Sequence, residues 1–254
     1  MAGTKTIITS FTNEGFEQYG RKFLKTLCHW PRDIRVIVYY EGDAFPEEID
    51  REEYQSINHI KGHDEFMSML KFPLMRGKMG KKYNINFDAR MCRKSLMHIH
   101  AGALGGKVFW VDADCLTHSK VPDGFLDEVL PDGKLCCYLG RDYMYTESGF
   151  MGFDTTHPHY HEFMKGLWNT LFSGLLFQLP GWHDCYAFDY VREHFPENDF
   201  VNLSANIPKH RGVHPFVNSV LGKHMDHLKG LRKKSGKSSK NDLIQPRKEM
   251  YWRA

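Results

Sequence analysis

The stretch KVFWVDADC, residues 107–115, decides the fold that we predict for this chain. Residues 108–111 are all apolar, which is typical of a strand buried on both faces of a sheet. The strand ends directly on Asp112 and Asp114. Two carboxylates spaced i and i+2 beyond a buried strand can turn toward one divalent cation, and hard oxygen ligands suit Mg²⁺ or Mn²⁺ on a diphosphate. The alternative for the motif alone is a pair of loop or cap aspartates.

The segments before this stretch alternate between strand and helix patterns. Residues 5–10 form a β-branched run, and residues 34–40 form a second one. Between them, residues 13–30 space Phe16, Phe23 and Leu27 along one face of a helix. A β-α-β start of this kind predicts an α/β domain, with a mainly parallel sheet and helices on its faces.

The segments on either side of residues 107–111 complete the predicted sheet and its helices. Residues 87–104 have the pattern of a helix that leads through two glycines into the strand. Further strands and helices follow, and they make the sheet mixed: strands at 135–140 and 149–153, helices at 157–177 and 182–195. We therefore predict one domain over residues 1–233. The Ser/Lys-rich residues 234–254 have the composition of a mobile basic tail, or of a lid that orders on substrate.

The composition describes an ordinary globular protein. Of 254 residues, 41% are hydrophobic and 26% are charged, which excludes a disordered or fibrous class. No apolar run approaches the roughly 18 residues of a membrane span, and the N-terminal sequence lacks the order of a signal peptide. The six cysteines form no CxxC pair, so we expect buried thiols rather than disulfides or zinc ligands. Together these features predict a cytoplasmic protein.

The sequence FDARMCRKSLMHIHAGALGGKVFWVDADC, residues 87–115, resembles the core of GT-A fold glycosyltransferases. In that family, a helix with a basic residue precedes an apolar strand that ends in a DxD motif, and here the resemblance extends from Lys5 to about Lys233. It implies a Rossmann-like GT-A domain and a metal-dependent, hexosyltransferase-type enzyme that uses Mn²⁺ or Mg²⁺ and a nucleotide sugar, with a UDP-sugar favoured.

The same resemblance assigns roles to individual residues around the motif. It implies that Asp114 is a direct metal ligand and that Asp112 contacts the metal or the donor ribose. Arg90 and Lys94, one turn apart on the preceding helix, would reach the donor phosphates or sugar. The alternative for this pair is ordinary charge on an exposed helix face.

A second motif lies far downstream, in HLKGLRK, residues 227–233. It looks like the HxxGxxK segment of retaining glycosyltransferases related to glycogenin, although Lys234-Ser235 follows where that family has Pro-Trp. The resemblance implies that His227 completes the metal site, that Gly230 lets the backbone approach the diphosphate, and that Lys233 neutralises it. It favours a retaining over an inverting outcome. The alternative is a solvated basic tail.

Two segments, residues 145–153 and 180–189, resemble the acceptor side of GT-A enzymes. By that resemblance Glu147 lies beneath the donor sugar, Trp182 stacks on a sugar face and Asp184 contacts the reacting hydroxyl. Asp184 is the first candidate for the catalytic group and Glu147 the second. A core tryptophan and capping or strand-end carboxylates are the alternatives.

The ends of the first two strands are the candidate site for the nucleotide base. In GT-A enzymes the base is usually held there, and the corresponding residues of this chain are Thr9, Ser10 and Phe11 on the first strand and Tyr39 or Tyr40 on the second. Tight loops at these strand ends would explain the same residues.

Two other functions compete with sugar transfer to a carbohydrate or other hydroxyl acceptor. A nucleotidyltransferase on a related sheet would release pyrophosphate, whereas the basic HxxGxxK segment favours a nucleoside diphosphate as the leaving group. A nucleic-acid-binding module would use the basic run Lys229–Lys240. We expect no nucleic-acid partner, because the net charge is only +3 and the two aspartates would go unused.

Overall fold

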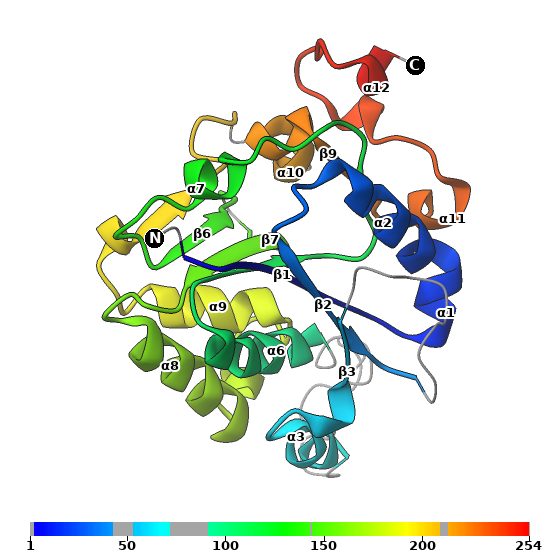
Figure 1. The fold of residues 1–254 in the computed structure, drawn as a ribbon. Helices are drawn as coiled ribbons and strands as arrows, with labels where there is room; N and C mark the ends of the chain where they lie inside the picture. The colour runs from blue at the N-terminus through cyan, green and yellow to red at the C-terminus, as the bar shows by residue number, and fades with distance from the viewer. Residues whose placement is uncertain (1–2, 43–52, 72–90, 143, 209–212, 254) are drawn as a thin grey trace.

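The computed structural model describes residues 3–42, 53–71, 91–142, 144–208 and 213–253. Its centre is a seven-stranded sheet with the strand order β3-β2-β1-β4-β7-β6-β8 (Figure 1). Pairing is parallel between β1 and β2, β1 and β4, β2 and β3, and β6 and β8, whereas β7 is antiparallel to β4 and β6. The predicted α/β class, with a mixed and mainly parallel sheet, is therefore confirmed. The strands are β1 Lys5–Phe11, β2 Arg35–Tyr40, β3 Glu53–Ser56, β4 Lys107–Val111, β6 Cys136–Leu139, β7 Glu147–Asp154 and β8 Phe200–Asn202.

The central strands are apolar on both faces because helices cover both faces. Every residue of β4 is buried. In β1 the neighbours Ile7 and Ile8 point to opposite faces and join two different hydrophobic clusters. This double burial explains why β4 is a continuous apolar run rather than an alternating one.

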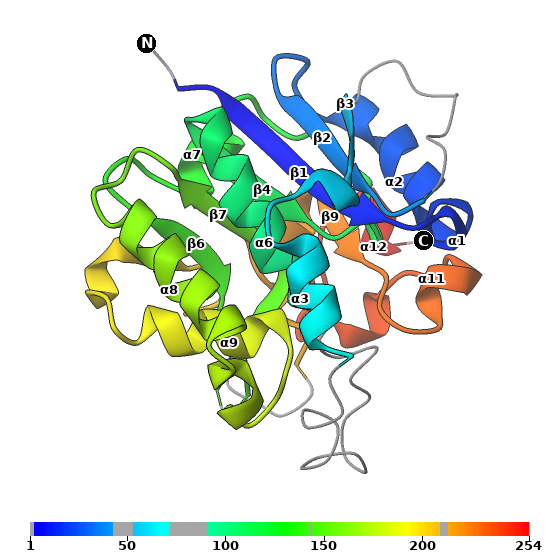
Figure 2. The ribbon, with the colours of Figure 1, turned by 90° about the horizontal axis from the view of Figure 1, so that it is seen from below.

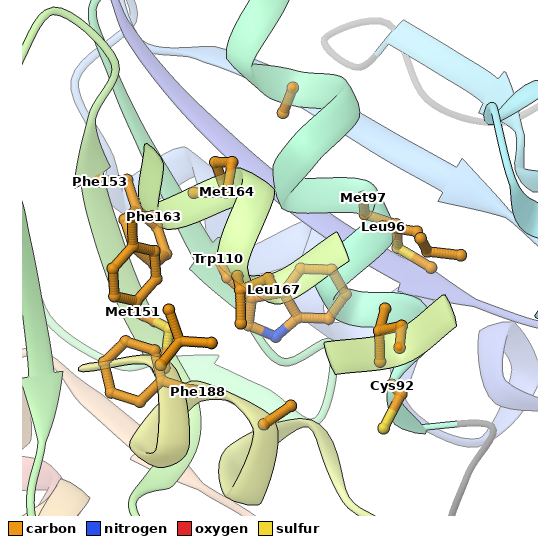
Figure 3. Close-up of a cluster of buried hydrophobic side chains, with 14 of the residues drawn as sticks. Cys92, Leu96, Met97, Trp110, Met151, Phe153, Phe163, Met164, Leu167 and Phe188 are labelled. Carbon is orange, nitrogen blue, oxygen red and sulfur yellow. The ribbon is translucent and has the colours of Figure 1, made fainter. Parts of the chain in front are cut away.

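Helices α6, α8 and α9 cover one face, and α2, α7 and α10 cover the other (Figures 1 and 2). Figure 3 shows the first cluster, in which Trp110 of β4 and Phe153 of β7 meet Phe163 of α8. The predicted helices at 157–177 and 182–195 contain α8 and α9, and the described part of 87–104 forms α6. The helices are α1 Asn13–Gly15, α2 Arg21–Thr26, α3 His63–Met69, α6 Arg93–Ala101, α7 Phe125–Val129, α8 Tyr160–Phe172, α9 Asp184–Arg192, α10 Pro215–Asn218, α11 Arg232–Ser235 and α12 Met250–Arg253.

A second, two-stranded sheet joins the segment after β4 to the C-terminal part of the chain. Strand β5, Cys115–Thr117, pairs antiparallel with β9, Met225–His227. Cys115 is the register partner of His227. The pairing therefore brings the start of the HxxGxxK motif beside the DxD motif.

The C-terminal segment packs on the domain. Trp252 is 2% exposed and belongs to the second hydrophobic cluster, and its Nε1 donates a hydrogen bond to the carbonyl of Gly222 at 2.8 Å. Ser239 is fully buried. One tryptophan and one small polar residue thus anchor the otherwise polar segment to the domain, and its behaviour as a tail or a lid stays a prediction.

Two expectations from the sequence are buried cysteine thiols and the lack of a membrane-spanning segment. Five cysteines are buried, as expected, but Cys28 is exposed on the short helical turn Leu27–His29. Within the described ranges, no helix combines the length and apolar character that crossing a lipid bilayer requires.

Candidate active site

The sheet topology places Asp112 and Asp114 beside the start of β7. Because β7 runs antiparallel to β4, its first residue Glu147 lies at the carboxyl end of β4, where the DxD motif begins. The backbone N–H of Asp112 donates to the carbonyl of Gly149 at 2.9 Å. Ligands of α/β sheets bind at this edge, so the fold itself positions these carboxylates for binding.

Asp112 and Asp114 both approach the Nε2 atom of His227. His227 Nε2 lies 3.1 Å from Asp114 Oδ1 and 3.5 Å from Asp112 Oδ2. The β5–β9 pairing produces this approach, and the N–H of Leu228 reinforces it by donating to the carbonyl of Asp114 at 3.1 Å. Two carboxylate oxygens and one imidazole nitrogen form a donor set that Mn²⁺ accepts readily.

Glu147 lies beside the second ring nitrogen of His227, which has no hydrogen-bond partner among the described residues. His227 Nδ1 lies 3.5 Å from Glu147 Oε1, and both side chains are 3% exposed. Metal-binding histidines usually direct their other ring nitrogen at a carboxylate, which fixes the ring orientation. The site residues therefore fit a divalent cation in their ligands and in the group that orients His227.

Three lysines each pair with a carboxylate of the site. Lys94 Nζ lies 2.8 Å from Asp112 Oδ1, and Lys233 Nζ lies 2.7 Å from Asp114 Oδ2. Lys229 forms an ion pair with Glu147. Each buried anion thus has a cation at contact distance, which is the condition for keeping it charged out of water.

The pKa shifts follow from this pairing. Burial alone would raise the pKa of Asp114, but His227 and Lys233 hold it well below its usual range. Burial acts the same way on Glu147, and His227 and Lys229 again lower its pKa. Burial would lower the pKa of Lys94, yet Asp112 and Asp184 raise it above its ordinary value. The carboxylates therefore stay ionised, and an incoming cation competes with lysine ammonium groups for them.

Two clefts meet at the aspartates. The first, of about 290 Å³, is lined by the end of β1, by α6 and by Tyr19. The second, of about 230 Å³, is lined by the start of β7 and the start of α9. Asp112, Asp114 and Lys233 line both clefts. A ligand whose middle part binds these three residues can therefore reach into the first cleft with one end and into the second cleft with the other.

No family model matches the chain, and no curated protein is significantly similar to it in sequence. Among solved structures, a glycosyltransferase involved in the glycosylation of the major capsid of PBCV-1 superposes with a TM-score of 0.54. The match is 12% identical and covers 92% of this chain and 100% of that chain. The chain has a glycosyltransferase fold.

Two further glycosyltransferases superpose less closely. Mouse xyloside xylosyltransferase 1 gives a TM-score of 0.48 at 12% identity, over 79% of this chain and 85% of that chain. The bifunctional glycosyltransferase WbbM gives 0.49 at 10% identity, over 80% of this chain and 39% of that chain. At these identities the likeness concerns the fold alone.

Of the residues predicted to hold the nucleotide, Ser10 and Phe11 line the first cleft of this glycosyltransferase fold. Thr9 and Tyr39 do not, because both are fully buried in the sheet. The Tyr39 hydroxyl instead meets His100 Nδ1 at 2.9 Å, inside the first hydrophobic cluster. Their predicted contact with the base is corrected: both side chains are already packed between layers.

Lys94 and Gly230 reach the site in different ways, and Arg90 lies outside the described residues. Lys94 is only 5% exposed, and its Nζ also donates to the carbonyl of Ser148 at 2.9 Å. This side chain holds Asp112 in place rather than extending from a helix surface. Gly230 lines the second cleft with φ of 61°, a left-handed conformation that favours glycine.

Trp182 is in the core, which corrects its predicted stacking on a sugar. It is 1% exposed and meets Phe177 edge-on, with ring centroids 5.0 Å apart. It lines neither of the two clefts at the aspartates. The reason is that Trp182 belongs to the first hydrophobic cluster, where its ring packs on Phe177 and its carbonyl accepts from Cys92 Sγ.

Other aromatic residues face the second cleft, and the sequence prediction missed them. Tyr145 and His183 both line it, with ring centroids 5.9 Å apart. The guanidinium of Arg141 lies 4.6 Å from the centroid of the Tyr145 ring. Their proximity in sequence to Glu147 and Asp184 was the available signal, because neighbours of site residues share the same strand and helix ends.

Asp184 and Glu147 differ in what their oxygens contact. Asp184, the first residue of α9, is 6% exposed and lines the second cleft, with its Oδ2 3.5 Å from Lys94 Nζ. Glu147 has Oε1 engaged by the N–H of Gly149 at 3.0 Å and Oε2 engaged by Lys229. Both oxygens of Glu147 are thus engaged within the protein, whereas Asp184 borders the second cleft.

Proposed function

We propose that this chain is a metal-dependent glycosyltransferase that moves a sugar from a nucleoside-diphosphate sugar to an acceptor hydroxyl. The observation that carries the proposal is the convergence of Asp112, Asp114 and His227 at the junction of two clefts, with Lys233 beside them. A donor of this kind needs such an arrangement: a base on one side, a sugar on the other and a diphosphate between them. The fold likeness supports the same conclusion.

The first cleft suits the nucleotide. Its lining includes the partly buried ring of Tyr19, against which a base or ribose packs. We favour UDP as the nucleotide, as the GT-A resemblance implies. We favour Mn²⁺ over Mg²⁺, because an imidazole belongs to the ligand set. When bound at the aspartates, the cation would neutralise the diphosphate and stabilise the departing nucleotide. Lys233 and the backbone at Gly230 would add donors on the same diphosphate.

The second cleft suits the sugar and the acceptor. Asp184 borders it and is our candidate for the group that meets the reacting hydroxyl, either as a general base or as a stabiliser of an oxocarbenium-like transition state. Tyr145 and His183 would take the stacking role at the acceptor, because their rings line the cleft and Trp182 is in the core. We favour a retaining outcome from the HxxGxxK resemblance.

The competing functions have less support. A nucleotidyltransferase would release pyrophosphate instead of a nucleoside diphosphate, and the fold likeness to a glycosyltransferase favours sugar transfer. A nucleic-acid module would need the basic run Lys229–Lys240 to face solvent as a continuous surface. Instead Lys229, Arg232 and Lys233 are engaged by Glu147, Asp242 and Asp114 respectively.

A donor screen tests the proposal directly. We expect the chain to hydrolyse one nucleotide sugar slowly in the presence of Mn²⁺, and to release a nucleoside diphosphate. Liquid chromatography of the products identifies base and sugar together, and a matched reaction with EDTA gives the cation dependence. Release of pyrophosphate would favour the nucleotidyltransferase. No turnover of any nucleotide sugar, with Mn²⁺ or with Mg²⁺, would overturn sugar transfer.

Lys233 should have opposite effects on the cation and on the nucleotide. Its ammonium pairs with Asp114 in the absence of ligand, so Lys233→Ala should let Mn²⁺ alone bind several-fold more tightly. The same change should weaken UDP in the presence of Mn²⁺ by about 10- to 100-fold, because a charged hydrogen bond to phosphate is lost. Calorimetric titrations measure both affinities.

The exposed neighbour Lys234 supplies the control for this prediction. Lys234→Ala changes the charge by the same amount but should leave both affinities near their original values. Weaker binding of Mn²⁺ alone by Lys233→Ala would show that Lys233 does not compete for Asp114.

A further inference from the structure

The C-terminal segment contacts the residue that precedes His227. Asp226 is fully buried, and its Oδ2 accepts hydrogen bonds from the backbone N–H of Ser239 and from the hydroxyl of Tyr251, each at 2.8 Å. Within the described part of the chain, Asp226 Oδ1 has no hydrogen-bond partner. A buried carboxylate with so few donors depends strongly on each of them. Ser239 and Tyr251 therefore fix where Asp226 can lie.

The same segment also contacts His227 itself. The hydroxyl of Ser239 donates to the carbonyl of His227 at 3.2 Å. On its other side, β9 pairs with β5, where Leu116 is the register partner of Asp226. The backbone that carries the His227 imidazole is thus held between β5 and the C-terminal segment.

Ser239 also fixes the two ends of a loop to each other. Residues 228–238 leave β9 and return to it, and they carry Lys229, Gly230 and Lys233 to the site. A second tie joins Arg232 in the loop to Asp242, which lies just beyond Ser239, with 2.7 Å between Nη2 and Oδ2. Loops whose ends are fixed together in this way stay compact and are often functional.

Tyr251 is itself held in place by aromatic packing. Its ring stacks on His118 with centroids 4.2 Å apart and an interplanar angle of 1°. Burial, followed by the charge of Asp226, raises the pKa of the Tyr251 hydroxyl, so it stays protonated and keeps donating. The neighbouring Trp252 anchors the end of the segment in the core.

We propose that Asp226, Ser239 and Tyr251 are positioning residues that hold His227 in place for a divalent cation, so that the C-terminal segment is part of the active site. This inference rests on the proposed function, because it takes His227 as a cation ligand. Groups that orient metal ligands typically alter metal affinity by about 10- to 100-fold when they are removed.

The test measures binding of Mn²⁺ alone to the full chain, by the electron paramagnetic resonance signal of free Mn²⁺. Tyr251→Phe keeps the ring on His118 and removes only the hydroxyl, and we expect it to raise the Kd for Mn²⁺ about tenfold. Ser239→Ala keeps the backbone bond to Asp226 and removes the bond to His227, and it should also raise this Kd. Circular dichroism reports whether each variant is folded.

Tyr160→Phe is the matched control. It removes a buried tyrosine hydroxyl that donates to the carbonyl of His98 at 3.2 Å, in the cluster on the other face of the sheet. A purely structural effect of losing such a hydroxyl would appear equally in Tyr160→Phe, whose Mn²⁺ affinity should match the parent protein.

The outcomes separate the two proposals. If the parent protein binds no Mn²⁺, the proposed function is overturned. If the parent binds Mn²⁺ and folded Tyr251→Phe and Ser239→Ala bind it equally well, the positioning inference alone is overturned. If Tyr251→Phe fails to fold, Ser239→Ala decides the question, because it removes a bond to His227 itself and leaves Asp226 and Tyr251 in contact.

Discussion

Asp114→Asn is expected to weaken cation-dependent UDP binding by about 10²- to 10³-fold, because one ionised ligand of the cation is lost. Asp114 is 5% exposed and lies between His227 and Lys233, so its carboxylate is held beside the imidazole nitrogen. The amide is nearly isosteric, and Lys233, whose side chain is 37% exposed, can turn to solvent. The fold should therefore remain intact. Calorimetric titration with UDP at saturating Mn²⁺ measures the loss.

Asp127→Asn is the control for this substitution. Asp127 on α7 also pairs with two lysines, Lys5 and Lys107, but it lines neither cleft at the site. It should change UDP affinity little. Unchanged binding of Mn²⁺ and UDP by Asp114→Asn would remove the DxD motif from the site.

The sequence predicted most of the fold because its central elements are locally unambiguous. Residues 108–111 are a continuous apolar run and lie in β4, and the helical pattern of residues 157–177 contains α8. Both patterns reflect burial against whole layers of the domain. They can therefore be recognised without knowing which distant residues make the contacts. The sequence likewise singled out Asp114 and His227, which the structure brings to 3.1 Å.

The misplaced residues depend on contacts that are distant in sequence. Tyr39 and Trp182 lie at the ends of elements, where a shift of one residue decides between a cleft and the core, and no periodicity specifies that choice. Strands β5 and β9 span only three residues each, too few for a pattern. The burial of Ser239 and Trp252 likewise depends on contacts with earlier parts of the chain. The polar composition of residues 234–254 gives no sign of those contacts.

Asp184→Asn is expected to lower kcat for sugar transfer by about 10²- to 10⁴-fold, the usual effect of losing a positioned acid–base or electrostatic group. The affinity for UDP should stay near its original value, because Lys94 keeps its closer partner Asp112 at 2.8 Å. The rate of donor hydrolysis then distinguishes the two roles. Unchanged hydrolysis indicates a base that acts on the acceptor, whereas an equal loss indicates stabilisation of the transition state.

Glu147→Gln provides the comparison, since Glu147 faces the same cleft but contacts His227 and Lys229. If Glu147 is a support, this change should raise the Kd for Mn²⁺, and transfer should recover at least in part at high Mn²⁺. Asp184→Asn should not recover under those conditions. Transfer at the parental rate by Asp184→Asn, together with a loss in Glu147→Gln that Mn²⁺ does not restore, would make Glu147 the catalytic carboxylate and Asp184 a structural one.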